Sequence, residues 1–195
     1  MRNFEYPDGA TPLDQDEIDG LRLKHLTTRG ELDRWEQENI QDALEWLEKR
    51  KKSDILSEDF ICRLHIKMFE KVWKWAGKFR HSDKNIGVDW KTIPVHLRQL
   101  LDDVKFWIEN KTFSADEIAA RFHHRLVWIH LFPNGNGRHS RLMTDVLLSE
   151  LLDADPFSWG SGNLSNTGDL RRTYIHALKL ADQQDYSLLV KFVRS

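Results

Sequence analysis

The chain has 195 residues, of which 40% are hydrophobic and 31% are charged, a composition typical of one soluble globular domain. The formal net charge of -2 provides no overall positive field, so we expect no nucleic-acid partner. Cys62 is the only cysteine, which excludes an intrachain disulfide, and no apolar run approaches the roughly 18 residues of a membrane span. We therefore expect a cytoplasmic protein with no membrane partner.

Residues 1–20 are predicted to form an N-terminal arm on the surface of a single domain that comprises residues 21–195. Turn-forming residues stand among acidic residues in this arm: Pro7, Gly9, Pro12 and Gly20. The segment from Met1 to Thr11 lacks the basic and then apolar pattern of a signal peptide.

Two long helices are predicted to open the domain. The first covers residues 31–52, because apolar and small residues recur on one helical face: Leu32, Trp35, Asn39, Ala43 and Leu47. The second begins near Ser57 and extends to Gly77, with a stripe of Ile61, Leu64, Met68, Val72 and Trp75.

The segment of residues 78–90 has no helical period, and we predict a short β-hairpin there. Asn85 or Gly87 can adopt the positive φ of a hairpin turn. A third helix then starts at Pro94, which suits a first helical turn, and ends near Asn110.

The next helix is predicted to start at a capping box, in which Ser114 is the cap and Glu117 follows three residues later. Pro133 ends this helix, and a further apolar run begins after Gly137. After a loop of residues 158–168, two helices close the chain over Leu170–Leu180 and Ser187–Val193. These elements predict an all-α fold, a helical bundle with one hairpin.

The segment between His130 and Arg141 carries the chemistry that we expect. A glycine-rich loop between two helices can turn several backbone N–H groups toward one point, at the positive end of the second helix. Arg138 and Arg141 are three residues apart and share a helix face, where their charge opposes the helix dipole unless an anion binds. Since a guanidinium can bind two phosphate oxygens at once, the segment predicts a phosphate site.

His130 lies at the edge of this loop and is the candidate general base. A histidine can accept a proton at neutral pH while it is unprotonated. The C-terminal end of a helix favours the protonated form, so another influence has to keep His130 neutral.

The whole segment resembles the signature of the Fic family, His-Pro-Phe-x-Asp/Glu-Gly-Asn-Gly-Arg-x-x-Arg. The positions that match are His130, Phe132, Gly135, Asn136, Gly137, Arg138 and Arg141. Gly77-Lys78-Phe79-Arg80 is similar to a stretch that precedes a hairpin "flap" in many Fic domains. The resemblance extends from about Gly20 to the end of the chain, and it is strongest to the mobile mystery protein B group, found on bacterial mobile elements.

The resemblance implies a protein adenylyltransferase, which moves AMP from ATP, with Mg²⁺, onto a Ser, Thr or Tyr hydroxyl of a target protein. His130 would take the proton of that hydroxyl, and Phe132 would anchor the loop. The nucleotide phosphates would bind to Gly135, Asn136, Gly137, Arg138 and Arg141. The flap residues that would pair with the target backbone are Asn85, Ile86, Gly87 and Val88.

Two positions depart from the signature. Leu131 replaces a proline, which changes the stiffness of the loop. Asn134 replaces the acidic residue that usually holds Mg²⁺, and a neutral amide oxygen is a weaker ligand for a hard cation. Magnesium would then depend more on ATP phosphates and water.

The stretch Thr27-Thr28-Arg29-Gly30-Glu31 resembles the Fic inhibitory pattern Ser/Thr-x-x-x-Glu-Gly/Asn, although Leu32 stands where Gly or Asn is expected. By this resemblance Glu31 would pair with Arg141 and block the nucleotide. The alternative is that Thr28 caps a helix and Glu31 only stabilises its first turn.

Other functions stay open at this point. A related Fic chemistry would transfer another nucleotide or phosphocholine, or would remove AMP. A non-catalytic module would bind a nucleotide or a partner, which Asn134 allows, but such a module has no need of a base at His130. His123 shares a helix face with His130, and we expect it to have a structural or positioning role rather than to bind a metal.

Overall fold

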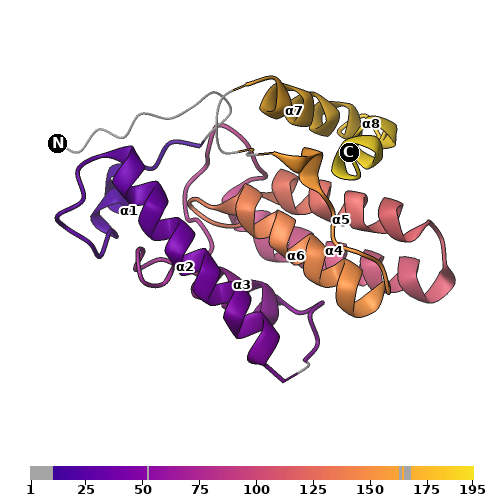
Figure 1. Ribbon diagram of the computed structural model, residues 1–195, viewed down its shortest axis with the longest axis horizontal. Helices are drawn as coiled ribbons and strands as arrows, with labels where there is room; N and C mark the ends of the chain where they lie inside the picture. Colours follow the sequence, from indigo (N-terminus) through magenta and orange to yellow (C-terminus); the bar gives the residue numbers. More distant parts are fainter. Residues whose placement is uncertain (1–10, 52, 163, 165–167) are drawn as a thin grey trace.

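The computed structural model describes residues 11–51, 53–162, 164 and 168–195, and these are mainly helical (Figure 1). The longer helices are α2 (Arg29–Lys49), α3 (Glu58–Phe69), α4 (Ile93–Asn110), α5 (Ala115–Ile129), α6 (Asn136–Leu151) and α7 (Asp169–Ala181). Shorter ones are α1 (Gln15–Asp19), α8 (Ser187–Val193) and two 3₁₀ turns, Trp90–Thr92 and Trp159–Ser161. The predicted all-α fold is confirmed.

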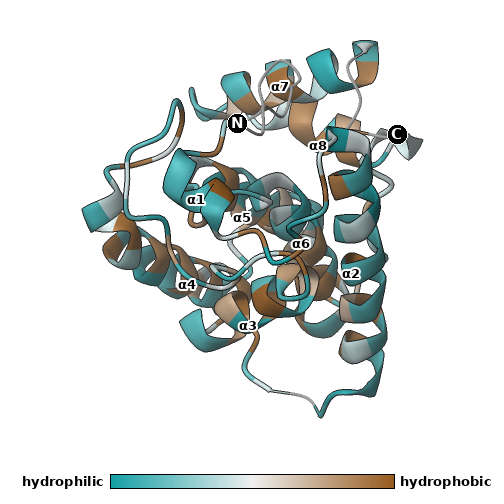
Figure 2. Ribbon diagram, turned by 90° about the vertical axis from the view of Figure 1, so that its left-hand side faces the viewer, coloured by the Kyte–Doolittle hydropathy of each residue, from teal (hydrophilic) through white to brown (hydrophobic). Residues whose placement is uncertain are grey.

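Helices α5 and α6 form the centre of the bundle. Helix α5 packs against α4, α6 and α8, while α6 also packs against α3, which in turn packs against α2. Helix α2 therefore runs along one side, and α7 and α8 lie across the top (Figure 1). A large apolar core fills the space among α2 to α6, and a smaller one lies beneath α7 and α8. Hydrophobic residues gather where α3 and α6 meet (Figure 2).

The starts of the helices agree with the capping residues in the sequence. The hydroxyls of Thr28, Ser57 and Ser114 each accept a backbone N–H of the helix that follows. The capping box at Ser114 is only half formed, because the Glu117 carboxylate turns to Arg121, 2.8 Å away, instead of to the cap. An ion pair four residues along a helix is a competing use of that carboxylate.

Helix α3 ends at Phe69, whereas the apolar stripe in the sequence predicted that it would extend to Gly77. Asn39 of α2 draws the chain away from the helix, since its amide donates to Lys67 O and accepts from Lys71 N, both at 2.9 Å. Gly77 has a φ of 76° and serves a later turn, where an added Cβ would lie 2.3 Å from Ile66. A contact between helices has therefore overridden the local period.

The predicted β-hairpin at residues 78–90 is not formed. Within the described ranges the only bridge between extended segments joins Leu21 and Trp73. The guanidinium of Arg80 explains the difference, because it donates to the carbonyls of Ser82 and Val88. Those carbonyls would otherwise pair across a hairpin, so the segment folds as a loop around Arg80.

The described part of the N-terminal arm is attached to the domain. Asp14 caps the short helix α1, and its carboxylate accepts from Ser82 Oγ at 2.8 Å. Residues 1–10 of the predicted arm lie outside the described residues, as do residues 163 and 165–167 of the predicted loop. In the part of the chain that the structure describes, every helix is too short or too polar to cross a bilayer.

Candidate functional site

The turn between α5 and α6 brings the matched signature residues together. His130 ends α5 in the left-handed conformation, with φ 57° and ψ 66°, which is uncommon for a residue other than glycine. Gly135 starts α6 with a φ of 79°. Two left-handed residues thus enclose the loop and reverse the chain within a few residues.

The loop is braced from inside by Asn136. Its side chain accepts from Phe132 N at 2.9 Å and donates to Phe132 O at 2.7 Å. Phe132 is fully buried, which agrees with the anchoring role implied by the resemblance. Both ends of the Asn136 amide are thus engaged by the backbone of Phe132, which fixes the loop.

His65 of α3, which the signature does not include, packs against the loop. Its ring stacks on Phe132 with 3.7 Å between centroids, its Nε2 lies 3.1 Å from Asn134 O, and its Nδ1 accepts from Gly77 N at 2.9 Å. Burial holds the pKa of His65 well below 6.5, so the ring is neutral. The signal in the sequence was its position directly after Leu64 in the buried stripe of α3.

The first turn of α6 presents backbone donors that have no acceptor among the described residues. His139 N makes the first bond within the helix, to Gly135 O, so the N–H groups of Asn136, Gly137 and Arg138 have no acceptor inside the helix. A Cβ at Gly135 would lie 2.6 Å from the Phe69 ring, whereas a Cβ at Gly137 would meet only Arg141, at 3.7 Å. Packing therefore requires the first glycine, while the second keeps space open above the donors.

Arg138 already forms an ion pair in this structure. Its Nη1 lies 2.8 Å from the Oε2 of Glu36, a residue of α2 that is 2% exposed. The other carboxylate oxygen of Glu36 accepts from Trp73 Nε1 at 2.6 Å. Trp35 was predicted to lie on the buried face of α2, but it is exposed. Glu36, four residues after Leu32, is buried on that face instead.

Arg141 lies one turn further along α6, and its guanidinium donates to the buried hydroxyl of Tyr174. The same hydroxyl lies 2.8 Å from His123 Nε2. Burial and the charge of Arg141 lower the pKa of His123 to about 3. The position of His123 agrees with a structural or positioning role.

A cavity of about 370 Å³ opens beside the two arginines, between α2, α6 and the segment that follows α6. Arg138, Arg141 and Asp145 face it from α6. Burial raises the pKa of Asp145 to about 6, although Trp159 Nε1 and Phe157 N both donate to its carboxylate. A cavity with two guanidinium groups and a helix start at its edge can accept a polyanionic ligand.

His130 is neutral in this structure. It is 5% exposed, and burial lowers its pKa to about 3, with the positive charges of Arg80 and Lys84 acting in the same direction. These are the influences that overcome the preference of a helix C-terminus for a cation. The neutral imidazole is the form that can accept a proton.

Arg80 fixes the end of α5 that carries His130. Its Nε donates to His130 O at 2.6 Å and its Nη2 to Ile129 O at 3.3 Å. These bonds satisfy carbonyls that the end of a helix leaves free. Since Arg80 also binds the carbonyls of Ser82 and Val88, it holds the loop predicted as the flap against His130.

The predicted flap residues lie beside the candidate base even though they form no hairpin. Gly87 has a φ of 106°, and a Cβ there would lie 2.7 Å from His130 Cβ. Val88 is buried, and Ile86 is 44% exposed. The loop thus forms one wall next to His130.

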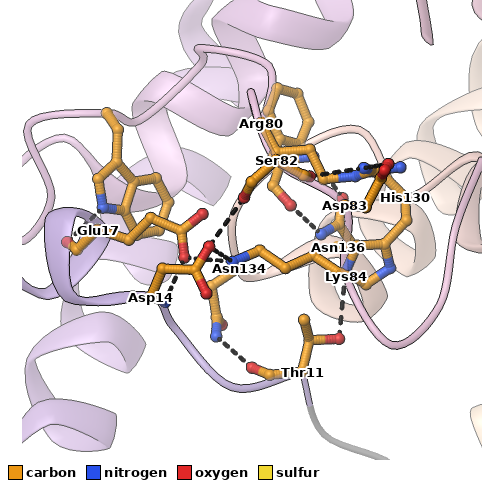
Figure 3. Close-up of polar contacts among 12 residues, drawn as sticks. Thr11, Asp14, Glu17, Arg80, Ser82, Asp83, Lys84, His130, Asn134 and Asn136 are labelled. Atoms are coloured by element: carbon orange, nitrogen blue, oxygen red, sulfur yellow. Dashed lines mark hydrogen bonds and ion pairs between the residues drawn. The ribbon is translucent and has the colours of Figure 1, made fainter. Parts of the chain in front are cut away.

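The N-terminal arm covers the other side of His130 (Figure 3). Thr11 Oγ1 lies 3.2 Å from His130 Nε2, and Asn134 Nδ2 donates to Thr11 O at 3.4 Å. Lys84 Nζ lies 2.7 Å from Asp14 and 2.6 Å from Glu17. Thr11 and Lys84 were not predicted as site residues, because no local pattern in the sequence relates them to the signature.

Asn134 offers one oxygen to a cation, and that oxygen already accepts from Gly135 N at 2.7 Å. A carbonyl oxygen has a second lone pair, so Asn134 fits Mg²⁺ as one ligand only. The described residues contain no group of three or more His, Cys, Asp or Glu side chains that could hold a metal. The donor set therefore requires phosphate and water oxygens to complete a magnesium shell.

Glu31 lies in the first turn of α2, where its carboxylate forms a capping box with Thr28. Its carboxylate accepts from Thr27 N at 3.1 Å and from Thr28 N at 3.0 Å, while Thr28 Oγ1 accepts from Glu31 N. These bonds lower the pKa of Glu31. This is the capping arrangement that the sequence left open as the alternative to a Glu31–Arg141 pair.

Comparison with known proteins agrees with this geometry. Residues 55–148 match the Fic/DOC family. The protein adenylyltransferase Fic of Drosophila sechellia is 31% identical over 121 residues, which cover 60% of this chain and 23% of the relative. The chain thus spans about a quarter of that relative's length.

Solved structures of Fic domains share the fold. The N-terminal FIC domain of Bep8 from Bartonella sp. 1-1C has a TM-score of 0.67 and 16% identity, covering 89% of both chains. BepC from Bartonella tribocorum, with bound AMPPNP, also has a TM-score of 0.67 and 16% identity, covering 97% of this chain and 93% of its own. Fic-1 from C. elegans has a TM-score of 0.57 and 24% identity, covering 80% and 45%.

Proposed function

The chain belongs to the Fic/DOC family, and from this premise we propose that it transfers AMP from ATP onto a Ser, Thr or Tyr hydroxyl of a target protein. The observation that carries the proposal is the single turn between α5 and α6, where a neutral His130 stands next to a helix start with free N–H donors and two arginines. The Drosophila relative is named as a protein adenylyltransferase, and BepC was solved with AMPPNP, which supports a nucleotide of this kind.

His130 is the proposed general base. It would take the proton of the target hydroxyl while the hydroxyl oxygen attacks the α phosphorus of ATP. The bond between the α phosphorus and its bridging oxygen would break, and pyrophosphate would leave. Removal of the proton by a positioned base typically contributes about 10²–10⁴-fold to a rate.

The start of α6 is the proposed phosphate site. The N–H groups of Asn136, Gly137 and Arg138 would face the phosphate oxygens, and the guanidinium groups of Arg138 and Arg141 would bind the outer phosphates. Fixed donors of this kind stabilise the charge that develops on the leaving group, and they need no reorganisation during the reaction. The Glu36 carboxylate now occupies one side of Arg138, so nucleotide binding has to replace that ion pair.

Magnesium would be held mainly by the nucleotide, with Asn134 supplying one oxygen. When bound, the ion would neutralise phosphate charge. The chain's own contribution at this position is to orient the Asn134 side chain, which the Gly135 N–H and the Thr11 carbonyl do in this structure.

Transfer of label tests the proposal. The purified chain and its His130→Ala variant are incubated with a cell lysate and ATP labelled at the α phosphate, and in parallel with ATP labelled at the γ phosphate. We expect protein labelling only with the α label and only with unmodified His130. Labelling from the γ phosphate would indicate kinase chemistry, and equal labelling by both proteins would remove His130 from the mechanism.

A further inference from the structure

Among the described residues, a hydroxyl of the chain itself lies next to the candidate base. Thr11 Oγ1 lies 3.2 Å from His130 Nε2, within the range of a hydrogen bond (Figure 3). Thr11 is 8% exposed and His130 is 5% exposed, so the contact is shielded from water. A threonine hydroxyl therefore already stands at the atom of His130 that would receive the proton of a target.

The contact is held by a set of bonds along the arm. Asn134 Nδ2 binds Thr11 O at 3.4 Å, which keeps Thr11 next to the loop that starts α6. Three residues later, Asp14 accepts from Ser82 Oγ and from Lys84 Nζ.

Lys84 is the centre of this attachment. Its side chain is 3% exposed, and its second partner, Glu17 of α1, is equally buried. A buried lysine that pairs with two carboxylates of one segment fixes that segment more firmly than an exposed ion pair does. The position of Thr11 is thus specified by its own contacts with His130 and Asn134 and by the bonds of Asp14, three residues later.

We propose that Thr11 is a site of self-modification, and that the chain transfers AMP to its own Thr11 hydroxyl in cis. This inference rests on the proposed function, because it uses the same base and the same phosphate site. Thr11 would occupy the place of a target residue, so the arm would act as an internal substrate before any other protein is admitted.

The step balances with ATP as the only co-reactant. His130 Nε2 takes the proton of Thr11, and the Thr11 Oγ1 forms a bond to the α phosphorus. The bond from that phosphorus to the leaving oxygen breaks, and pyrophosphate departs. The product is a phosphodiester between Thr11 and adenosine, whose negative charge would lie near the side chains of Arg80 and Lys84.

The sequence offers a direct readout. Trypsin cleaves after Arg2 and Arg22, and the peptide between them contains two hydroxyl side chains, Tyr6 and Thr11. The purified chain is incubated with ATP and Mg²⁺ and the peptide is analysed by tandem mass spectrometry. We expect one added AMP on Thr11, which persists in Tyr6→Phe and Thr11→Ser and is lost in Thr11→Val and His130→Ala.

Two outcomes would overturn the inference. The first is labelling of lysate proteins, or of other residues of the chain, with Thr11 unmodified, which leaves the proposed function standing. The second is the absence of any labelled protein, which contradicts the proposed function as well.

The cis route is tested by mixing. Thr11→Val keeps the base and serves as catalyst, and His130→Ala keeps Thr11 and serves as acceptor. We expect the unmodified chain to label Thr11 with a rate constant that does not depend on protein concentration, and the mixture to label it at least about tenfold more slowly, because it lacks the effective concentration of an attached arm. Equal rates would replace the cis route by reaction between two chains.

Substitution of Lys84 tests whether the attached arm positions Thr11 for the reaction. Lys84→Gln should reduce the labelling of Thr11 by a larger factor than the labelling of lysate proteins, because it releases the arm. Lys71→Gln removes an exposed pair with Asp42, 2.7 Å apart, and is the matched control that should change neither. Lys84→Arg should restore the labelling of Thr11. An equal fall of both labels in Lys84→Gln would mean that Lys84 only supports the fold.

Discussion

The candidate site has two halves that meet in one loop, and one half is open to ligands while the other is closed. The phosphate half is open, with a cavity of about 370 Å³, free N–H groups at the start of α6 and two arginines beside it. The acceptor half is closed, because Thr11, Arg80 and the loop around Gly87 surround His130. A charged ligand is attracted by fixed donors, whereas a base is kept neutral by exclusion of water. Admission of a target hydroxyl therefore requires displacement of the arm, whereas nucleotide binding requires that the Arg138–Glu36 ion pair be replaced.

The largest expected effect concerns the acceptor half. His130→Asn should lower the transfer rate by about 10²–10⁴-fold, because it removes the base. Asparagine tolerates the left-handed conformation of this position, so the fold should persist. Transfer from α-labelled ATP measures the rate, and circular dichroism checks the fold. Because the phosphate half lies on the other side of the loop, calorimetry should give an unchanged nucleotide affinity for His130→Asn. A large loss of affinity would show that the two halves do not act independently.

The phosphate half was predictable from the sequence because its parts are local. The signature, the glycines and the arginines lie within residues 130–141, and the helix before and the helix after them follow from periodicity. The neutral state of His130 was only stated as a requirement, and the structure supplies the cause in burial and in the charges of Arg80 and Lys84.

The acceptor half depends on contacts that periodicity does not encode. Thr11 reaches His130 across 119 residues of sequence, and Lys84 reaches Asp14 across 70. The loop at residues 78–90 has the composition of a hairpin, but a buried guanidinium uses its carbonyls. Likewise, Glu36 is buried at a position where a charged residue is expected to face solvent, because Trp73 and Arg138 both bind it.

The next effect separates two glycines of the phosphate half. Gly135→Ala should destabilise the chain by about 2–4 kcal/mol, since a methyl group would collide with the Phe69 ring and the φ of 79° disfavours it. Gly137→Ala should leave stability equal or raise it by up to about 1 kcal/mol, because alanine favours a helix.

The affinity of the two variants completes the test. A methyl group at Gly137 fills the space above the free N–H groups, so nucleotide affinity should fall about tenfold, the loss of one hydrogen bond to a charged group. Thermal unfolding gives the stabilities and calorimetry gives the affinities. A destabilised Gly137→Ala with normal affinity would show that this glycine serves packing.

A smaller effect, on the free energy of unfolding, should appear at low pH. Burial lowers the pKa of His139 from 6.5 to about 4, below its value in the unfolded chain. The unfolded chain therefore binds the proton first, and this group's contribution to stability is lost as pH falls from about 6.5 to 4, at about 1.4 kcal/mol per pH unit. His139→Gln should remove that slope and keep a donor for Ile61 O, 3.0 Å from the ring nitrogen.

Urea unfolding at several pH values measures the slope. His25→Gln, at an exposed position, is the matched control and should leave it unchanged. Because His139 belongs to the start of α6, a reduced slope in His139→Gln would connect the acid sensitivity to the phosphate half. An unchanged slope would assign it to the other buried histidines.

The smallest effect concerns the two glutamates of α2. Glu36→Gln should keep the hydrogen bond from Trp73 and release Arg138 for phosphate, whereas Glu31→Gln should affect only the cap of α2. Arg138 is partly exposed, so the ion pair is worth about 1 kcal/mol, and its loss should raise nucleotide affinity about fivefold. Calorimetry with ATP measures the gain, and thermal unfolding checks both variants. If nucleotide affinity rises in Glu31→Gln and not in Glu36→Gln, the inhibition of nucleotide binding would be assigned to the stretch that resembles the inhibitory pattern. Glu31 would then have to leave its cap to reach Arg141.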